Sequence, residues 1–302
     1  MQNEDIDTIE TEFGPQYSED NEFKRKARLH QSKYRKYLHA DFSGYGNRLA
    51  EKDALQGMNF YSGLDGLFEE VKKRYRLKYT PLYYDMLRSE HIPFNFFIPF
   101  KYFRQLGKDI LNHFMEDKIS EIEQVKIEYA PKPKGSYLND NTSFDTYIEY
   151  KHVDNTLGFI GIEVKYTEQE YDYTEKEKAD IYNPSSTYNR LTRRIGIYQE
   201  NCLEKLKTPK YKQVWRNQLL GESILEKDKG FKHFTSIIIF PAGNHHFVDA
   251  CNSYSRFLKE DFRSKFIGIT YEDFIQAGNY YCTDSKQKSW LEYLKSRYLI
   301  TD

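Results

Sequence analysis

Cysteine is scarce in this chain. The three cysteines among 302 residues, Cys202, Cys251 and Cys282, are widely spaced. Their odd number and spacing match neither a disulfide framework nor a metal-binding cysteine motif, so we expect free thiols in a reducing compartment. The first residues lack the basic start and apolar run of a signal peptide. No run of about 18 apolar residues predicts a membrane span. We therefore expect a cytoplasmic protein that contacts no membrane.

The chain also lacks an excess of charge of either sign. Lys and Arg number 45 and Asp and Glu 46, which gives a net charge of −1. Any affinity for a polyanion must then come from local basic patches. There is no Gly-x-Ser-x-Gly elbow and no phosphate-cradling glycine loop. His245 and His246 follow a turn without further ligands at zinc spacing. These absences argue against serine hydrolases, P-loop enzymes and zinc enzymes of the usual motifs.

The composition is that of a folded protein. Hydrophobic residues make up 39% and aromatic residues 17% of the chain. Residues 1–22 contain eight acidic and no basic residues, and we expect them to form a flexible acidic arm. We predict a helical N-terminal extension over residues 23–82 and the main domain over residues 83–302.

A basic segment follows the acidic arm. It runs from Lys24 to Lys36, with seven Lys or Arg residues and no acid. One interpretation is a solvated helix neutralised by the acidic arm. The other is a contact with a phosphate backbone, to which Arg190, Arg193 and Arg194 on a later predicted helix would add a second patch.

The centre of the chain predicts a hairpin. Its strands are residues 143–152, which contain Asp145, and residues 158–166, which contain Glu163 and Lys165. Because strand side chains alternate between faces, Glu163 and Lys165 share one face and apolar residues share the other. Pairing of the strands would bring the two carboxylates and the ammonium group together.

Two carboxylates with room for water suit Mg²⁺. A lysine beside them can orient water or stabilise charge on a phosphate, so the set is suited to phosphodiester hydrolysis. The Glu-x-Lys pattern alone carries little information, because the chain contains it five times. Glu149 and Lys151 are the main rival pair, on a strand and on the same face as Asp145. A salt bridge at the edge of the sheet is the alternative interpretation of Glu163 and Lys165.

The order of predicted elements indicates an α/β fold. Helices, three strands, helices, a strand, a helix and a strand follow one another, which predicts a central mixed β-sheet flanked by helices. The strands are expected near residues 119–130, 143–152, 158–166, 234–240 and 266–270.

At Asp145, Glu163 and Lys165 the sequence resembles the PD-(D/E)XK, or restriction-endonuclease-like, nuclease superfamily. It also resembles a bacterial group of restriction endonucleases within it. The stretches that carry this resemblance are Gly46-Asn47-Arg48-Leu49, Met86 to His91, Phe94 to Phe97, Phe144-Asp145, Gly158 to Tyr166, Gln213 to Arg216 with Leu219-Leu220, and Pro241 to Asn244. One departure is Phe144, which stands where the family often has proline.

The resemblance implies a restriction-endonuclease-like core and a metal site. Mg²⁺, for which Mn²⁺ can substitute, would be held by Asp145, Glu163 and the carbonyl group of Val164. Lys165 would position the attacking water.

The family also suggests two additional catalytic candidates. A glutamate from a helix before the sheet often joins such sites, and Glu90 is the candidate here. A glutamine on a following helix is the other, and Gln213 fits that place.

The leading functional hypothesis is a Mg²⁺-dependent DNA endonuclease of a bacterial restriction or anti-phage system. Its partners would be DNA, a second copy of the chain for double-strand cutting, and a defence-system protein. The alternatives are a catalytically silent module that binds nucleic acid or a partner protein, and an RNase with the same site.

Overall fold

The chain folds into two compact units in the computed structural model, which describes residues 3–300 and their side chains from residue 8 onward. One unit comprises Met1–Phe103 with Tyr271–Asp302, and the other comprises Arg104–Thr270. The boundaries predicted after residues 22 and 82 cut the chain differently. The C-terminal helices join the N-terminal segment because Trp290 packs there and donates a 2.8 Å hydrogen bond from Nε1 to the carbonyl oxygen of Asn95. Within residues 3–300, no helix has the length and apolar character needed to span a membrane.

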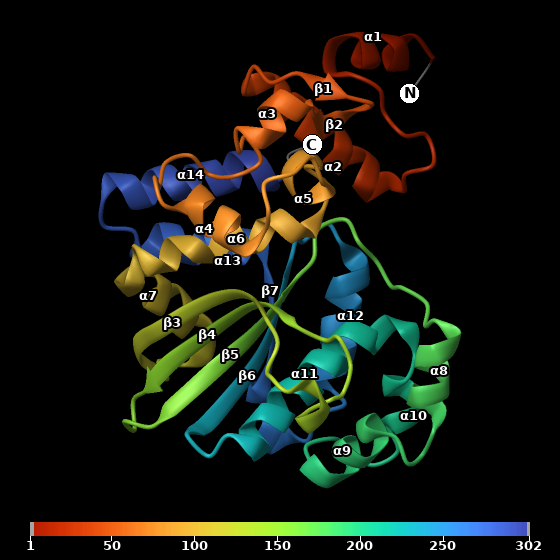
Figure 1. Ribbon diagram of the computed structural model, residues 1–302, viewed down its shortest axis with the longest axis vertical. Helices are drawn as coiled ribbons and strands as arrows, with labels where there is room; N and C mark the ends of the chain where they lie inside the picture. The colour runs from red at the N-terminus through yellow and green to blue at the C-terminus, as the bar shows by residue number, and fades with distance from the viewer. Residues whose placement is uncertain (1–2, 301–302) are drawn as a thin grey trace. The chain divides into compact units, whose positions relative to one another are not determined.

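The unit Arg104–Thr270 is built on a five-stranded sheet in the order β3-β4-β5-β6-β7. The strands β3, β4 and β5 are antiparallel, whereas β5, β6 and β7 are parallel. This arrangement confirms the predicted mixed sheet flanked by helices (Figure 1). The strand bounds are β3 Ile119–Tyr129, β4 Phe144–His152, β5 Leu157–Val164, β6 Phe231–Phe240 and β7 Phe266–Thr270.

The predicted hairpin is the pair β4 and β5. Thr146 lies opposite Ile162, and Ile148 lies opposite Ile160. Every residue of β5 except Leu157 is buried, as expected for a strand in the middle of a covered sheet. The antiparallel register places the start of β4, with Asp145, beside the end of β5, with Glu163.

Helix α11 covers β5 and β6 (Figure 1). It approaches closely because Gly221 has no side chain, and the ring of Phe234 occupies the space that a Cβ atom would take. Helix α9, Thr187–Ile195, ends at Gly196, whose φ of +66° favours glycine. The helices of this unit are α7 Arg104–Met115, α8 Glu175–Tyr182, α9 Thr187–Ile195, α10 Leu203–Leu206, α11 Lys212–Lys227 and α12 His245–Ser255, with short 3₁₀ turns η3 Lys134–Ser136, η4 Pro209–Tyr211 and η5 Glu260–Lys265.

The other unit is mainly helical. Part of the acidic segment forms a helix, and residues 42–49 form a small hairpin. The aromatic residues from Phe94 to Phe100 are buried in its core. Its elements are α1 Asn3–Phe13, α2 Glu22–Tyr37, β1 Phe42–Ser43, β2 Tyr45–Leu49, α3 Glu51–Leu55, α4 Leu67–Arg74, α5 Pro81–Tyr84, η1 Ser89–His91, α6 Ile92–Phe97, η2 Ile98–Lys101, α13 Tyr271–Tyr281 and α14 Ser285–Tyr298.

Candidate active site

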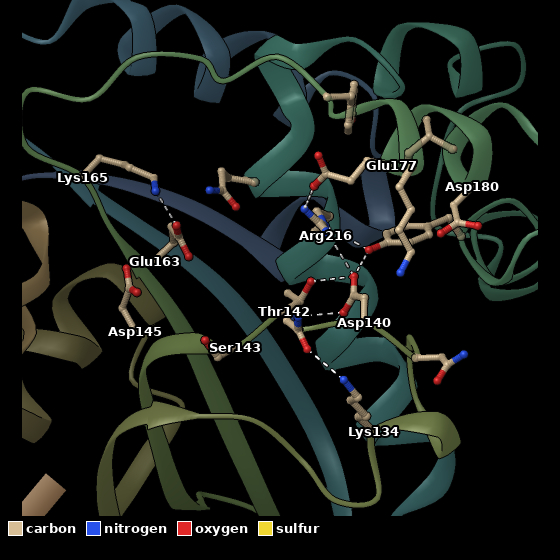
Figure 2. Close-up of a pocket in the computed structure, with 17 residues that line it drawn as sticks. Lys134, Asp140, Thr142, Ser143, Asp145, Glu163, Lys165, Glu177, Asp180 and Arg216 are labelled. Atoms are coloured by element: carbon tan, nitrogen blue, oxygen red, sulfur yellow. Dashed lines mark hydrogen bonds and ion pairs between the residues drawn. The ribbon is translucent and has the colours of Figure 1, made fainter. Parts of the chain in front are cut away.

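Asp145 and Glu163 lie side by side at one end of the sheet (Figure 2). Asp145 is the second residue of β4, and its Oδ2 accepts a 2.7 Å hydrogen bond from the backbone N–H of Val164. This bond ties the carboxylate of one strand to the end of the next. The predicted convergence of the two acidic residues is therefore present.

Lys165 completes the cluster. Its Nζ lies 2.6 Å from Oε1 of Glu163, and both side chains are less than one tenth exposed. The backbone N–H of Lys165 donates to the carbonyl oxygen of Ile239 in the neighbouring strand β6, at 2.9 Å. The lysine is thus held from both its backbone and its side chain.

The charges of this cluster do not balance. Burial and the neighbouring charge of Glu163 raise the pKa of Asp145 well above its ordinary value. Burial alone would lower the pKa of Lys165, but the charges of Glu163 and Asp145 outweigh burial and raise it. Two carboxylates facing one ammonium group leave one negative charge uncompensated, and this suits a divalent cation. The residues present therefore fit a Mg²⁺ site.

A cavity of about 560 Å³ opens next to these three residues. Its far wall is a polar network centred on Arg216 of α11 (Figure 2). Arg216 contacts Glu177 at 2.9 Å and Asp140 at 3.0 Å, and its Nε donates to the hydroxyl of Tyr188 at 2.9 Å. Tyr188 in turn donates a short hydrogen bond to Asp140. Because two acids already neutralise Arg216, this wall is a scaffold rather than a free cationic surface.

Gln213 and Glu90 have different positions. Gln213 lines the cavity at the start of α11, in the same unit as Asp145 and Glu163. Glu90 belongs to the other unit, where its half-exposed carboxylate lies 3.9 Å from Arg88. The cavity is formed by residues of Arg104–Thr270 alone, and the catalytic role of Glu90 stays a prediction.

The rival pair is not part of this cavity. Glu149 forms an ion pair with Lys126 on β3, at 3.1 Å, and lines no part of the cavity. Glu149 is thus part of a salt bridge between neighbouring strands of the sheet.

The basic segment on α2 is largely neutralised. Arg28 forms a buried ion pair with Asp20 at 2.5 Å, and Lys36 contacts Glu12 at 2.8 Å. Arg35 is buried and donates to the backbone carbonyl groups of Gly46 and Ala40. These contacts support the interpretation of a helix neutralised by the acidic segment.

In the second basic patch, on α9, Arg194 is engaged with Glu226 at 2.6 Å. Arg190 and Arg193 are exposed. Arg193 donates to the carbonyl oxygen of Pro184 at 3.2 Å.

The prediction from sequence missed Asn217. This buried residue of α11 donates a 2.5 Å hydrogen bond from Nδ2 to Oε2 of Glu163. A signal existed in the sequence, because an amide on the apolar face of a helix needs a buried partner. The identity of that partner, 54 residues earlier, could not be read from the pattern.

Comparison with known families agrees with this geometry. No curated protein and no solved structure matches the chain. The model of the PD-(D/E)XK nuclease superfamily matches residues 18–300. The chain therefore belongs to the PD-(D/E)XK nuclease superfamily.

Proposed function

We propose that the protein is a Mg²⁺-dependent endonuclease that hydrolyses phosphodiester bonds in DNA. The observation that carries this proposal is the cluster of Asp145, Glu163 and Lys165 beside a cavity, with Lys165 Nζ held 2.6 Å from Glu163. A buried ion pair is costly to maintain for stability alone. A catalytic role would explain why the ion pair of Glu163 and Lys165 lies beside the second carboxylate, Asp145.

The residues would divide the chemistry as follows. Mg²⁺ bound by Asp145, Glu163 and the carbonyl of Val164 would stabilise negative charge on the scissile phosphate and acidify the attacking water. Because its pKa is raised, Lys165 remains an ammonium group. It would donate a hydrogen bond that orients the water or a phosphate oxygen, and it would not act as a base. Attack by the water would form a new P–O bond as the P–O bond to the leaving oxygen breaks, with the proton of the water lost to solvent and a proton from solvent taken up by the leaving oxygen.

The predicted secondary residues keep distinct roles in this proposal. Gln213 lines the cavity and would contact a phosphate oxygen of the substrate. A catalytic role for Glu90 stays a prediction from the family resemblance.

A role in bacterial restriction or anti-phage defence is also part of the proposal. It is supported by the resemblance to restriction endonucleases. Double-strand cutting would use a homodimer, because one site cuts one strand, and a further defence protein would be the natural partner.

Incubation with nucleic acids tests the function. Supercoiled plasmid, phage DNA and single-stranded RNA are incubated separately with Mg²⁺, Mn²⁺ or EDTA. Wild type is compared with Lys165→Ala and with the matched control Lys151→Ala. The control removes the lysine of the rival pair, Glu149 and Lys151. We expect metal-dependent cutting of DNA by wild type and Lys151→Ala, and a loss of about 10²-fold or more in Lys165→Ala.

The other outcomes identify the alternatives. Cutting of RNA alone would assign an RNase. Nucleic-acid binding without cutting in any metal would assign a catalytically silent module. Full activity in Lys165→Ala would refute the role given to this lysine. A loss of phage resistance in cells that express Lys165→Ala instead of wild type would support the defence role.

A further inference from the structure

A second cluster of metal-ligating side chains lies at the opposite end of the sheet from Asp145 and Glu163. It consists of His152, the last residue of β4, Asp154 in the following turn, and His233 near the start of β6. The seven residue-to-residue steps from Asp145 to His152 along β4 span roughly 23 Å at about 3.3 Å per step. The cluster is therefore separate from the candidate active site.

The three side chains converge on one point. Their ligand atoms all lie within 4.8 Å of one another. Nδ1 of His152 lies 3.0 Å from Oδ1 of Asp154, and Nε2 of His233 lies 3.0 Å from Oδ2. With bonds of about 2.0–2.1 Å, neighbouring ligands of a tetrahedral ion are about 3.3 Å apart. Each histidine-to-carboxylate distance is within a few tenths of an ångström of this spacing.

The turn holds Asp154 in place before any ion binds. Its Oδ1 accepts hydrogen bonds from the backbone N–H of Thr156 at 2.9 Å and from the Thr156 hydroxyl at 2.6 Å. Asn155 completes the turn with a φ of 68°. The carboxylate is thus preorganised toward the two histidines.

The two imidazole rings of the cluster are stacked on each other. Their centroids are 3.8 Å apart with an interplanar angle of 15°. The stacking holds the rings of β4 and β6 beside each other, so that one divalent cation would contact both ring nitrogens and the carboxylate.

We propose that His152, Asp154 and His233 bind one Zn²⁺ ion that has a structural role. Two imidazole nitrogens and one carboxylate suit Zn²⁺ better than Mg²⁺, which prefers oxygen ligands. The side chains are 14%, 47% and 32% exposed, so an ion can enter from solvent and a water can take the fourth position.

Such an ion would link β4 to β6 around the start of β5. In the sheet order, β5 lies between these two strands, and it carries Glu163 at its far end. The ion would fix this end of the three strands in register. Its removal would loosen the hairpin and leave the catalytic side chains in place.

The test uses the full, tag-free chain with Glu163→Ala, which removes a carboxylate of the active site. After treatment with chelator, the protein is titrated with Zn²⁺ and with Mg²⁺ by calorimetry. We expect one Zn²⁺ per chain and no Mg²⁺ at the cluster. Removing a residue that only hydrogen-bonds to a metal ligand typically lowers metal affinity about 10–100-fold. His233→Gln removes a ligand itself, so it should lower Zn²⁺ affinity about 100-fold or more.

Controls separate the site from surface binding and from misfolding. His245→Gln removes an exposed histidine elsewhere in the same unit and should leave Zn²⁺ binding unchanged. Circular dichroism in chelator shows whether His233→Gln is folded, and Asp154→Asn repeats the test in a variant that keeps acceptors for Thr156. Binding of Co²⁺ to the Glu163→Ala protein should give the intense visible absorption of a tetrahedral site. This absorption should be absent when His233→Gln is added.

The proposal is overturned if Zn²⁺ does not bind saturably, or if binding is unchanged in both His233→Gln and Asp154→Asn. The three residues would then be a hydrogen-bonded cluster. Neither result depends on nuclease activity, so the outcome is independent of the proposed function.

Discussion

Asn217 donates a hydrogen bond to the same carboxylate that pairs with Lys165. Its Nδ2 lies 2.5 Å from Oε2 of Glu163, while Lys165 Nζ lies 2.6 Å from Oε1. The glutamate is therefore oriented from both sides, by the end of its own strand and by α11. The position of α11 on the sheet thus fixes the orientation of the Glu163 carboxylate.

Replacement of Asn217 tests this relationship. Asn217→Ala frees one oxygen of Glu163, and we expect the affinity for Mg²⁺ to fall about 10–100-fold, the usual effect of losing a partner of a metal ligand. Cleavage should recover at high Mg²⁺ concentration. The measurement is the dependence of the cleavage rate on Mg²⁺ concentration.

The adjacent residue provides a matched control. Gln218 is also a buried amide on α11 and donates to Glu222 at 3.0 Å, outside the site. Gln218→Ala should cost a similar free energy of unfolding and leave the Mg²⁺ requirement unchanged. An equal shift in both variants would assign Asn217 a purely structural role.

Without a bound metal ion, the ionised Asp145 lowers the free energy of unfolding at neutral pH. Burial and the charge of Glu163 raise its pKa above the unfolded value, so the folded state binds this proton more tightly. Its contribution to the free energy of unfolding is present at pH values below the unfolded pKa and is lost as the pH rises through the folded pKa. Asp145→Asn should remove this loss.

We therefore expect Asp145→Asn to abolish cleavage but to stabilise the metal-free protein at pH 7. The gain should be about 0.5–2 kcal/mol, the range of single stabilising substitutions. Denaturant unfolding of both proteins at several pH values in EDTA measures the difference. A constant difference between pH 4 and pH 8 would contradict the explanation.

A third prediction concerns the attachment of α8 to α11 at acid pH. Glu177 of α8 contacts Lys212 and Arg216 of α11, each at 2.9 Å. Partial burial alone would raise its pKa, but the backbone N–H of Thr174 and the ammonium of Lys212 outweigh burial and hold the pKa at about 2. A lowered pKa stabilises the fold above the unfolded value of 4.5, and this contribution is lost as the pH falls toward 2.

Glu177→Gln should remove this acid-dependent contribution. Because Glu177 is about one quarter exposed, we expect a loss of at most about 2 kcal/mol at pH 7 and little difference from wild type near pH 2. Glu175→Gln is the control, since this carboxylate is 90% exposed and forms its ion pair with Lys178 of its own helix. Hydrogen exchange of α8 at pH 3 and pH 6 would localise the effect.

The sequence was sufficient to predict the parts of the site that depend on local pattern. The alternation of Ile160, Ile162 and Val164 with Glu163 and Lys165 identifies a strand and its faces, and a hairpin pairs neighbouring segments. The mixed sheet was predictable for the same reason, because its strands are apolar runs bounded by turns.

Contacts between distant segments were not predictable. Asn217 reaches Glu163 only because α11 packs across β5 and β6. The residues around Asn217 in the sequence do not indicate which residue it contacts. The C-terminal helices belong to the N-terminal unit through contacts such as Trp290 with Asn95, 195 residues apart. Such pairings depend on tertiary packing, which local periodicity does not determine.

The basic helix α2 gives the last prediction, because its arginines face two environments. Arg28 is buried against Asp20 and donates to Asn47 at 2.7 Å, whereas Arg25 is exposed. Arg28→Ala leaves the Asp20 charge buried without this partner and should cost about 3–5 kcal/mol of unfolding free energy. Arg25→Ala should leave stability unchanged.

If α2 contacts DNA, Arg25→Ala should weaken binding at every sequence and reduce the slope of log affinity against log salt by about 1. Filter binding at several salt concentrations, beside denaturant unfolding, separates the two effects. An unchanged slope in Arg25→Ala would show that this arginine makes no phosphate contact, in agreement with a helix neutralised by the acidic segment.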